Sequence, residues 1–387
     1  MNVNRVRHLE NALIHFERSC ATSETSTESV GSHLRSYFRA HKGKLVSKDR
    51  EWISEKFKDL YRWKSLVEHF SKAEATPSDQ LRTYFGNQTW RSYSDSKILK
   101  EHIRVSMPEQ LYSRLSRHYG KAKASDIGRI WNEASTTYVR VNPLIEDREK
   151  LLKVLSARGI GIEKTAVSEL GLKITQAEDL ELLPELADHA CSFQDESCQI
   201  IGSQLVVKPG DKVMDYCSGS GGKSLVFAPV LKGKGHLFLH DIQSRYLVQA
   251  RHKLRDAGIR NFSCLGPDAS QQLRRLRGKM DWILVDPPST GSGHYRRYPE
   301  RKWLFNDSML DQKVKVQREI FASALQYLRG NGGKIVYATS SILPEENAHQ
   351  LEYFCERHKL FLSTEPVYSL PQSHGMDGFF CAVLERQ

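Results

Sequence analysis

Apolar residues recur at intervals of three and four positions over the first part of the chain. Between Val30 and about His118 no strand-like alternation interrupts this spacing. The recurring residues include Leu34, Tyr37, Phe38, Trp52, Ile53, Phe57, Leu60, Tyr61, Trp63, Leu66 and Phe70. Such stripes are typical of helices that face a core, so residues 1–125 are predicted to form an all-helical domain. An amphipathic stretch at 10–18 precedes them, and the polar stretch 21–29 is predicted to be a loop or the entry to a helix.

The pattern changes after residue 125. Residues 136–143 are rich in β-branched side chains and end in a turn signal, which predicts a strand. Mixed strand and helix patterns continue to about residue 185. We interpret residues 126–195 as a small α+β subdomain.

From residue 196 onward, apolar strand patterns alternate with helical patterns, which predicts parallel βαβ units. Strands are expected at 212–215, 236–240, 282–286, 334–338 and 379–384. Helices are expected between them, notably at 244–257 and 312–328. The predicted fold class of residues 196–387 is therefore α/β, with a Rossmann-like, mostly parallel sheet.

Charge and cysteine content narrow the choice of partner and compartment. Lys and Arg outnumber Asp and Glu by 57 to 46, which favours a polyanionic partner over a membrane. No apolar run reaches the roughly 18 residues of a membrane span, and the first residues lack a targeting pattern. The seven cysteines are scattered, without a C-x-x-C pair or zinc spacing, which predicts reduced thiols and no metal site. We expect a cytoplasmic protein.

A glycine-rich turn, Val213–Ser224, connects the first of these strands to a helix. Glycines let backbone N–H groups approach a ligand, and the helix N-terminus favours the ligand's negative end. Cys217 stands where a P-loop would have its first glycine, which disfavours ATP. The candidate cofactor-binding residues of this turn are Asp215, Cys217, Ser218, Gly219, Gly221, Gly222 and Lys223.

Four acidic residues lie at the ends of successive strand patterns. Asp215 ends the first strand, and Asp241 follows the second, where a cofactor ribose would offer its hydroxyls. Asp268 and Asp286 follow at later strand ends. Because the carboxyl edge of a parallel sheet is the usual position of a bound ligand, these acids, together with Arg245, complete the candidate site for a nucleoside cofactor.

The order of these motifs resembles that of the RsmB and nucleolar Sun-type RNA (cytosine-5) methyltransferases. The resemblance covers roughly residue 106 to the C-terminus. It rests on the segments 194–199, 215–223, 296–303 and 344–347, with Asp241, Asp268 and Asp286 between them. It implies a class I S-adenosylmethionine-dependent methyltransferase domain, preceded by an α+β RNA-binding subdomain. The helical domain before them is similar to the RNA-binding fold of the antitermination factor NusB.

The resemblance also implies roles for individual residues. The 217–223 turn would face the methionine part of S-adenosylmethionine, Asp241 would bind its ribose, and Asp268 would lie near its adenine. Asp286 would hydrogen-bond the target base, and Lys223 would steady Asp286 or the neighbouring backbone.

Serine stands at three positions where the family pattern has another residue. Ser340 replaces the nucleophilic cysteine, Ser289 replaces the cysteine that helps to release the product, and Ser220 replaces a proline of the glycine turn. A thiol, with a pKa of about 8.5, is partly thiolate at neutral pH. A serine hydroxyl needs a strong adjacent base, for which the sequence offers His294 and Glu345 as candidates.

These substitutions leave three interpretations of the chemistry. The protein could bind cofactor and RNA without efficient catalysis. It could instead methylate an exocyclic amine, because the D-P-P sequence at 286–288 is the turn of amino-methyltransferases, although Ser289 stands where those enzymes carry an aromatic residue. In the third interpretation another nucleophile acts, and Cys217 is the only cysteine inside the cofactor motifs, where it could simply pack the turn. The candidate catalytic residues are Asp286, Ser340, Ser289 and Lys223.

Arginine and aromatic residues are mixed in the segment 294–303. Arginine pairs with phosphates and aromatic rings stack on bases, so this segment is predicted to flank the active cleft and to bind RNA. A second basic cluster, 274–279, could widen the positive face or be a solvated helix end. The candidate RNA-binding residues are Arg296, Arg297, Lys302 and Trp303, with Arg140 and Asn142, which could equally hold their turn. Ribosomal RNA is the substrate that the resemblance implies.

Overall fold

The computed structural model describes residues 3–22, 29–86, 88–176 and 184–386. The chain divides into two compact units, residues 1–135 with 294–309 and residues 136–293 with 310–387. The helical unit extends past the predicted boundary at 125, because helix α8 (Lys121–Trp131) runs across that position. The segment 294–309, which the sequence pattern placed in the last domain, belongs to the helical unit.

The first unit is built from helices, as the three-and-four spacing predicts. They are α1 (Val3–Thr22), α2 (Val30–Ala40), α3 (Ser47–Arg62), α4 (Lys64–His69), α5 (Pro77–Phe85), α6 (Glu101–Arg104), α7 (Glu109–Tyr119) and α8, with the 3-10 helices η1 (Gln88–Asp95) and η5 (Pro299–Leu304). Leu9, Leu34, Ile53 and Phe57 pack in one buried cluster. Most of the polar stretch 21–29 lies outside the described residues, but its last residue, Ser29, caps α2 by accepting a hydrogen bond from the backbone N–H of Ser32.

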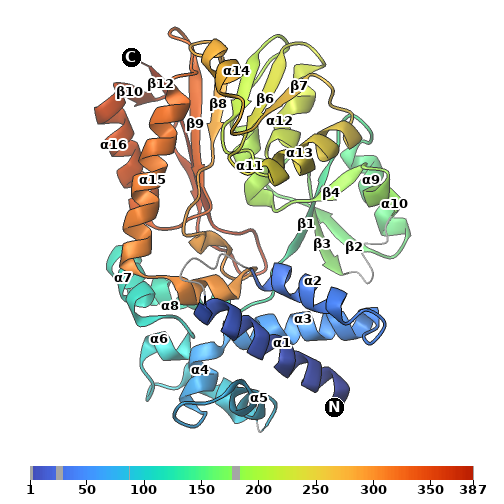
Figure 1. Cartoon of the computed structure of the whole chain (residues 1–387), viewed down its shortest axis with the longest axis vertical. Helices are drawn as coiled ribbons and strands as arrows, with labels where there is room; N and C mark the ends of the chain where they lie inside the picture. Colours follow the sequence, from blue (N-terminus) through green and yellow to red (C-terminus); the bar gives the residue numbers. More distant parts are fainter. Residues whose placement is uncertain (1–2, 23–28, 87, 177–183, 387) are drawn as a thin grey trace. The chain divides into compact units, whose positions relative to one another are not determined.

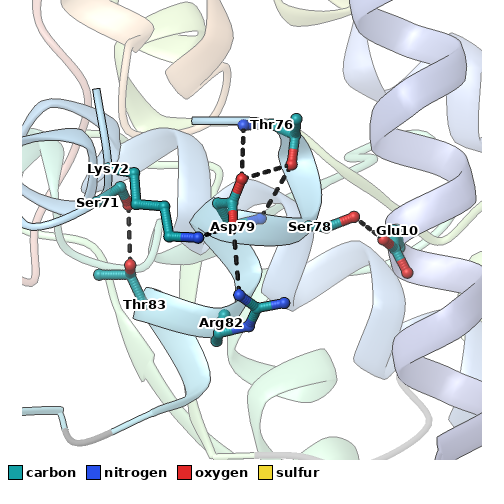
Figure 2. A network of polar contacts seen from close by, with 8 residues as sticks. All are labelled: Glu10, Ser71, Lys72, Thr76, Ser78, Asp79, Arg82 and Thr83. Carbon is teal, nitrogen blue, oxygen red and sulfur yellow. Dashed lines mark hydrogen bonds and ion pairs between the residues drawn. The ribbon is translucent and has the colours of Figure 1, made fainter. Parts of the chain in front are cut away.

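The start of helix α5 shows how local sequence sets a helix boundary (Figure 2). The hydroxyl of Thr76 accepts a hydrogen bond from the backbone N–H of Asp79 at 3.3 Å, and Asp79 accepts one from the backbone N–H of Thr76 at 3.3 Å. This reciprocal capping box satisfies two backbone donors. Pro77 takes the first helical position, where it costs no hydrogen bond. Ser78 adds a hydrogen bond to Glu10 of α1, which ties the two helices together.

The second unit begins with a four-stranded antiparallel sheet in the order β2-β3-β1-β4. Its elements are β1 (Thr137–Val141), α9 (Arg148–Ala157), β2 (Gly161–Lys164), β3 (Gly171–Gln176), α10 (Pro184–Ala187) and β4 (Cys191–Phe193). Val139 and Val141 of the central strand pack with Leu151 and Leu155 of α9. Figure 1 shows α9 and α10 beside this sheet.

A larger sheet follows, in the order β10-β12-β9-β8-β5-β6-β7, with β11 also paired to β12. Its strands are β5 (Lys212–Asp215), β6 (His236–His240), β7 (Phe262–Leu265), β8 (Trp282–Val285), β9 (Lys334–Thr339), β10 (Leu360–Leu362), β11 (Val367–Ser369) and β12 (Phe379–Arg386). Strands β5 to β9 pair in parallel, and β12 runs antiparallel to β9. The carboxyl ends of the five parallel strands therefore lie at one edge of the sheet. The four candidate acids are at this edge.

Helices cover both faces of this sheet. They are α11 (Glu196–Ser203), α12 (Ser224–Phe227), α13 (Ser244–Asp256), α14 (Ser270–Arg275), α15 (Asp307–Leu325) and α16 (Ala348–His358), with 3-10 helices η3 (Ala228–Leu231), η4 (Ser292–His294) and η6 (Pro344–Glu346). Leu247 of α13 packs in the cluster that contains Leu239. Phe321 of α15 packs in the cluster on the opposite face, with Ile283. No helix in the described residues is long and apolar enough to cross a membrane.

Candidate cofactor and catalytic site

The glycine turn after β5 has the backbone that a ligand cradle needs. Gly219 and Gly221 have φ angles of 50° and 76°, in the left-handed region that favours glycine. A Cβ on Gly219 would meet nothing within 4 Å, so the turn is open beside it. A Cβ on Gly221 would lie 3.2 Å from the Cβ of Ala250, because α13 packs closely there. Ser220, in place of the family's proline, accepts a hydrogen bond from Lys253 of α13 at 2.8 Å.

Asp215 is buried beneath this turn. Its Oδ2 accepts a hydrogen bond from the hydroxyl of Ser224 at 2.7 Å, which joins the end of β5 to the start of α12. Burial raises the pKa of Asp215 to about 7. Asp215 therefore braces the turn from below. The backbone N–H of Ser218, in the same turn, donates to the carbonyl oxygen of His240 at 3.0 Å, which fixes the turn against β6.

Asp241, directly after β6, reaches the same turn. Its Oδ2 accepts from the backbone N–H of Gly219 at 2.9 Å, and its Oδ1 accepts from that of Gln243 at 2.8 Å. Each carboxylate oxygen has a second lone pair, so Asp241 keeps acceptor capacity for the hydroxyls of a ribose. Asp268 is exposed on the loop after β7, and Arg245, exposed at the start of α13, donates to the side chain of Gln243.

Lys223 and Asp286 form an ion pair between the glycine turn and the end of β8. Burial lowers the pKa of Lys223, but the Asp286 carboxylate more than offsets this, and the net pKa lies above its ordinary value. The backbone of the turn is held on its other side by Gln194, whose side-chain amide donates to the carbonyl oxygen of Gly222 at 2.8 Å.

The segments that carry the two serines are joined by hydrogen bonds. The backbone N–H of Gly293 donates to the carbonyl oxygen of Ser340 at 2.9 Å, and that of Ile342 donates to the hydroxyl of Ser292 at 2.9 Å. Gly293 can only be glycine, since a Cβ there would lie 2.0 Å from the carbonyl oxygen of Gly378. The hydroxyl of Ser289 accepts from the N–H of its own turn, at Gly291.

The hydroxyl of Ser340 is hydrogen-bonded to no base among the described residues. Within the described part of the chain, no hydrogen bond involves its side chain, and the residue is half-buried. Of the two candidate bases, His294 falls in the helical unit and Glu345 lies in η6. A serine without an adjacent base is a poor nucleophile, so the geometry weighs against covalent attack by Ser340.

The charges of Lys223 and Asp286 influence the pKa values of three thiols. The sequence pattern pointed only to one of them, Cys217. Burial raises the pKa of Cys198, raises that of Cys217 well above its ordinary value, and raises that of Cys381 to about 12. All three are therefore protonated at neutral pH, which weighs against any of them as the alternative nucleophile. Cys198 in α11 and Cys381 in β12 lie on elements separate from the glycine turn, so the local pattern of that turn could not group them with Cys217.

Arg140 and Asn142 hold the backbone of the small sheet. Both are 2% exposed. Arg140 donates to the carbonyl oxygen of Val141 and the hydroxyl of Ser192, and burial lowers its pKa to about 10. The amide of Asn142 donates to the carbonyl oxygens of His189 and Ala257. Of the two roles that the sequence allowed, the structure favours the turn-holding one, because neither side chain is open to solvent.

The proposed RNA-binding segment 294–303 is packed into the helical unit. Arg296 and Lys302 are both 0% exposed. The ammonium group of Lys302 donates to the carbonyl oxygen of Arg62 at 2.8 Å and to Oδ1 of Asn132 at 2.9 Å. Trp303 donates to the carbonyl oxygen of Tyr61 at 2.8 Å, and Arg297 is half-buried. The structure does not favour RNA contacts by Arg296 and Lys302, since neither side chain is exposed.

Comparisons with known proteins agree with this arrangement. The model of 16S rRNA methyltransferases RsmB/F matches residues 203–385, and the ferredoxin-like domain of RsmF/B-like methyltransferases matches residues 107–181. Ribosomal RNA small subunit methyltransferase B of Proteus mirabilis is 27% identical, over 84% of this chain and 77% of that protein. The enzyme of the same name from Serratia proteamaculans is 31% identical, over 72% of this chain and 66% of its own length.

Solved structures share the fold. The crystal structure of PH0851 covers 100% of this chain and 99% of its own, with a TM-score of 0.80 at 19% identity. That of NSun6 from Pyrococcus horikoshii with SFG covers 72% of this chain and 98% of its own, with a TM-score of 0.65 at 18% identity. From the order of its site residues, its fold and these matches, the chain belongs to the RsmB/Sun family of methyltransferases.

Proposed function

We propose that this protein transfers a methyl group from S-adenosylmethionine to RNA, that ribosomal RNA is its substrate, and that it works in the cytoplasm. The observation that carries the proposal is the Lys223–Asp286 pair beside an open glycine turn at the carboxyl edge of the sheet. The named activity of the relatives from Proteus and Serratia supports the substrate.

The residues around the turn suit the cofactor. Asp241 would accept from the ribose hydroxyls, Asp268 would lie near the adenine, and the open backbone at Gly219 would admit the methionine part. When bound, S-adenosylmethionine supplies an electrophilic methyl group. The structure neighbour NSun6, determined with SFG, an analogue of S-adenosylmethionine, supports this cofactor.

The ion pair suits the orientation of a base. Asp286 offers carboxylate oxygens that accept hydrogen bonds from a base, and the ion pair with Lys223 holds that carboxylate in place. Neither group can add to carbon 6 of cytosine. Transfer to carbon 5 would need a nucleophile in place of the two thiols that serine replaces, and the Ser340 hydroxyl is hydrogen-bonded to no base among the described residues.

Because no described base is hydrogen-bonded to the Ser340 hydroxyl, a second candidate function is favoured. The protein would then bind S-adenosylmethionine and RNA but transfer no methyl group, acting as an RNA-binding protein. Methylation of a base amine is the third possibility, since direct attack by an amine on the methyl group requires no covalent nucleophile.

One assay separates these functions. The protein is incubated with tritiated S-adenosylmethionine and total RNA from a strain that lacks it, and the RNA is digested to nucleosides and identified by mass. Label in 5-methylcytosine would show carbon-5 transfer, and label on an exocyclic nitrogen would show the amine route. If no label enters the RNA while both ligands bind, the methyltransferase proposal fails and the binding function stands. The Asp286→Asn variant is the control, and it should lose any label that the wild type transfers.

A further inference from the structure

A basic pocket of about 600 Å³ lies along strand β7 in the second unit. In the described part of the large sheet, β7 is the last strand in the order, so the pocket lies at a free sheet edge. Helix α13 and helix α14 flank it, and the turn before β7 adds to its wall. The residues that matter to the argument are Arg251, Arg255, Arg260, Arg275, Phe238 and Phe262.

The four arginines reach this pocket from three elements. Arg251 and Arg255 are four residues apart on α13 and therefore share one face of that helix. Arg260 lies in the turn before β7, and Arg275 ends α14. All four are exposed, and no carboxylate lines the pocket. Positive charge is thus concentrated there without an acidic neighbour.

No acid neutralises these arginines. Within the described residues, none of the four forms an ion pair; the one internal contact is that of Arg260, which donates to the carbonyl oxygens of Arg255 and Ile259. Other arginines of the same unit are paired, as Arg158 is with Glu185 at 2.8 Å and Arg329 is with Asp281. Four unpaired guanidinium groups around one pocket repel each other, and a bound polyanion would remove that repulsion.

The pocket is separate from the candidate cofactor site. It shares no residue with the cofactor-binding set. In a parallel βαβ unit each helix runs back toward the amino ends of the strands. Arg255 and Arg275, in the last turns of α13 and α14, therefore lie toward the ends of the strands opposite to Asp241 and Asp268.

We propose that this pocket binds the phosphodiester backbone of single-stranded RNA, outside the nucleotide that enters the catalytic site. The inference rests on the proposed function for the identity of the polymer. Guanidinium groups bind phosphate oxygens bidentately. The half-buried ring of Phe262 packs on the α13 side of the sheet and that of Phe238 packs on the opposite side, so each gives a base an apolar surface on its own side of the edge. The volume of the pocket lies within the range of roughly 300 to 1,000 Å³ that is typical of ligand pockets.

The exposed basic cluster at 274–279 then has a function. Arg274, Arg277 and Lys279 are exposed beside Arg275. They extend the positive surface beyond the pocket, so an RNA strand that leaves it would meet further cations. Of the two interpretations that the sequence allowed for this cluster, the pocket favours the one in which it widens the RNA-binding face.

The test is RNA binding by the full chain with Arg251→Ala and Arg255→Ala together. The probe is a fluorescein-labelled single-stranded RNA of about 20 nucleotides, followed by fluorescence anisotropy over a series of KCl concentrations. We expect weaker binding and a salt slope lower by about 1.4, because each lost phosphate contact to a single strand contributes about 0.7. The matched control is Lys315→Ala with Arg357→Ala, which removes the same charge from α15 and α16 and should leave the slope near that of the wild type.

Other outcomes would overturn the proposal. Equal slopes for the pocket variant and the wild type would do so, as would an equal loss in the control variant. Displacement of the wild-type protein's RNA by polyglutamate, but not by unlabelled RNA, would identify an acidic protein segment as the ligand instead. If the double variant unfolds, Arg275→Ala on a different element gives the same test with an expected loss of about 0.7 in slope. Binding is measured without methyl transfer, so a failure of the proposed activity would leave this result unaffected.

Discussion

Lys223 donates a hydrogen bond from its ammonium group to Oδ2 of Asp286, although the two residues are 63 positions apart in the chain. Their side chains are 14% and 21% exposed. The pair thus links the glycine turn to the end of β8 in a place that water reaches only in part. Removing one partner leaves the other charge poorly solvated, which gives the pair a measurable effect on stability.

We expect Lys223→Met to lower the free energy of unfolding by about 2 kcal/mol, because the Asp286 carboxylate loses the cation with which it is paired. Urea unfolding followed by circular dichroism measures this. Lys234→Met, at an exposed lysine of the same unit, should change it by less than about 0.5 kcal/mol. Equal stabilities of the two variants would contradict the importance of the pair.

Asp241→Ala should weaken the binding of S-adenosylmethionine at least about tenfold, or about 1.4 kcal/mol, because both the ribose acceptor and the anchor of Gly219 are lost. Isothermal titration calorimetry gives the dissociation constant. Asp256→Ala, at an exposed aspartate at the end of α13, is the matched control and should bind as the wild type does. Unaltered affinity in Asp241→Ala would refute the assignment of the cofactor site.

Ser340→Cys should raise the yield of 5-methylcytosine above that of the wild type, because a thiol supplies the thiolate that the serine hydroxyl cannot. No described residue forms a hydrogen bond with the Ser340 side chain, so the substitution by cysteine removes no hydrogen bond among them. The yield is measured by digestion and mass identification after incubation with tritiated S-adenosylmethionine. Ser289→Cys alone is the control and should leave the yield unchanged. A Ser340→Cys protein that also binds both ligands but makes no 5-methylcytosine would show that more than the thiol is missing.

The sequence predicted the large sheet well because its strands are short apolar runs that end in acids or glycines. The predicted strands 212–215 and 236–240 coincide with β5 and β6. Strand β7 carried no such run, since Phe262–Leu265 includes a serine and a cysteine and is only partly buried. The predicted strand 379–384 lies within β12, but β10, which pairs outside it, was not predicted. That pairing involves only three residues and leaves little trace in the sequence.

The candidate RNA-binding segment was harder to place. Basic and aromatic residues at 294–303 have the composition of an exposed RNA-binding loop, and composition alone does not show that backbone and side-chain acceptors elsewhere in the chain can bury a cation. Lys302 shows this: its two acceptors belong to Arg62 and Asn132, at least 170 residues away. The pocket at β7 was missed for the related reason that its arginines come from three separate elements.

We predict that Asn142→Ala lowers the free energy of unfolding by about 2 to 3 kcal/mol, because buried backbone groups lose their partners. Its effect on the salt slope of RNA binding should be nil, since its side chain is buried. Chemical denaturation and anisotropy measure the two quantities on the same protein. Asn331→Ala, at an exposed asparagine, is the control for stability. A lower salt slope in folded Asn142→Ala would restore the RNA-contact interpretation.

The buried carboxyl of Asp215 makes stability depend on pH. Its pKa rises from 3.8 to about 7 on folding, so the folded protein keeps a proton that the unfolded chain releases. The free energy of unfolding should therefore fall as the pH rises from about 4 to about 7, by at most about 1.4 kcal/mol per pH unit. Above pH 7 this loss of stability is complete. Asp215→Asn should remove this dependence, measured by urea unfolding at several pH values. Ser224→Ala should extend the upper end of the window to higher pH, because the hydroxyl that donates to Asp215 stabilises its carboxylate. A pH profile of Asp215→Asn that is parallel to that of the wild type would mean that Asp215 is ionised throughout.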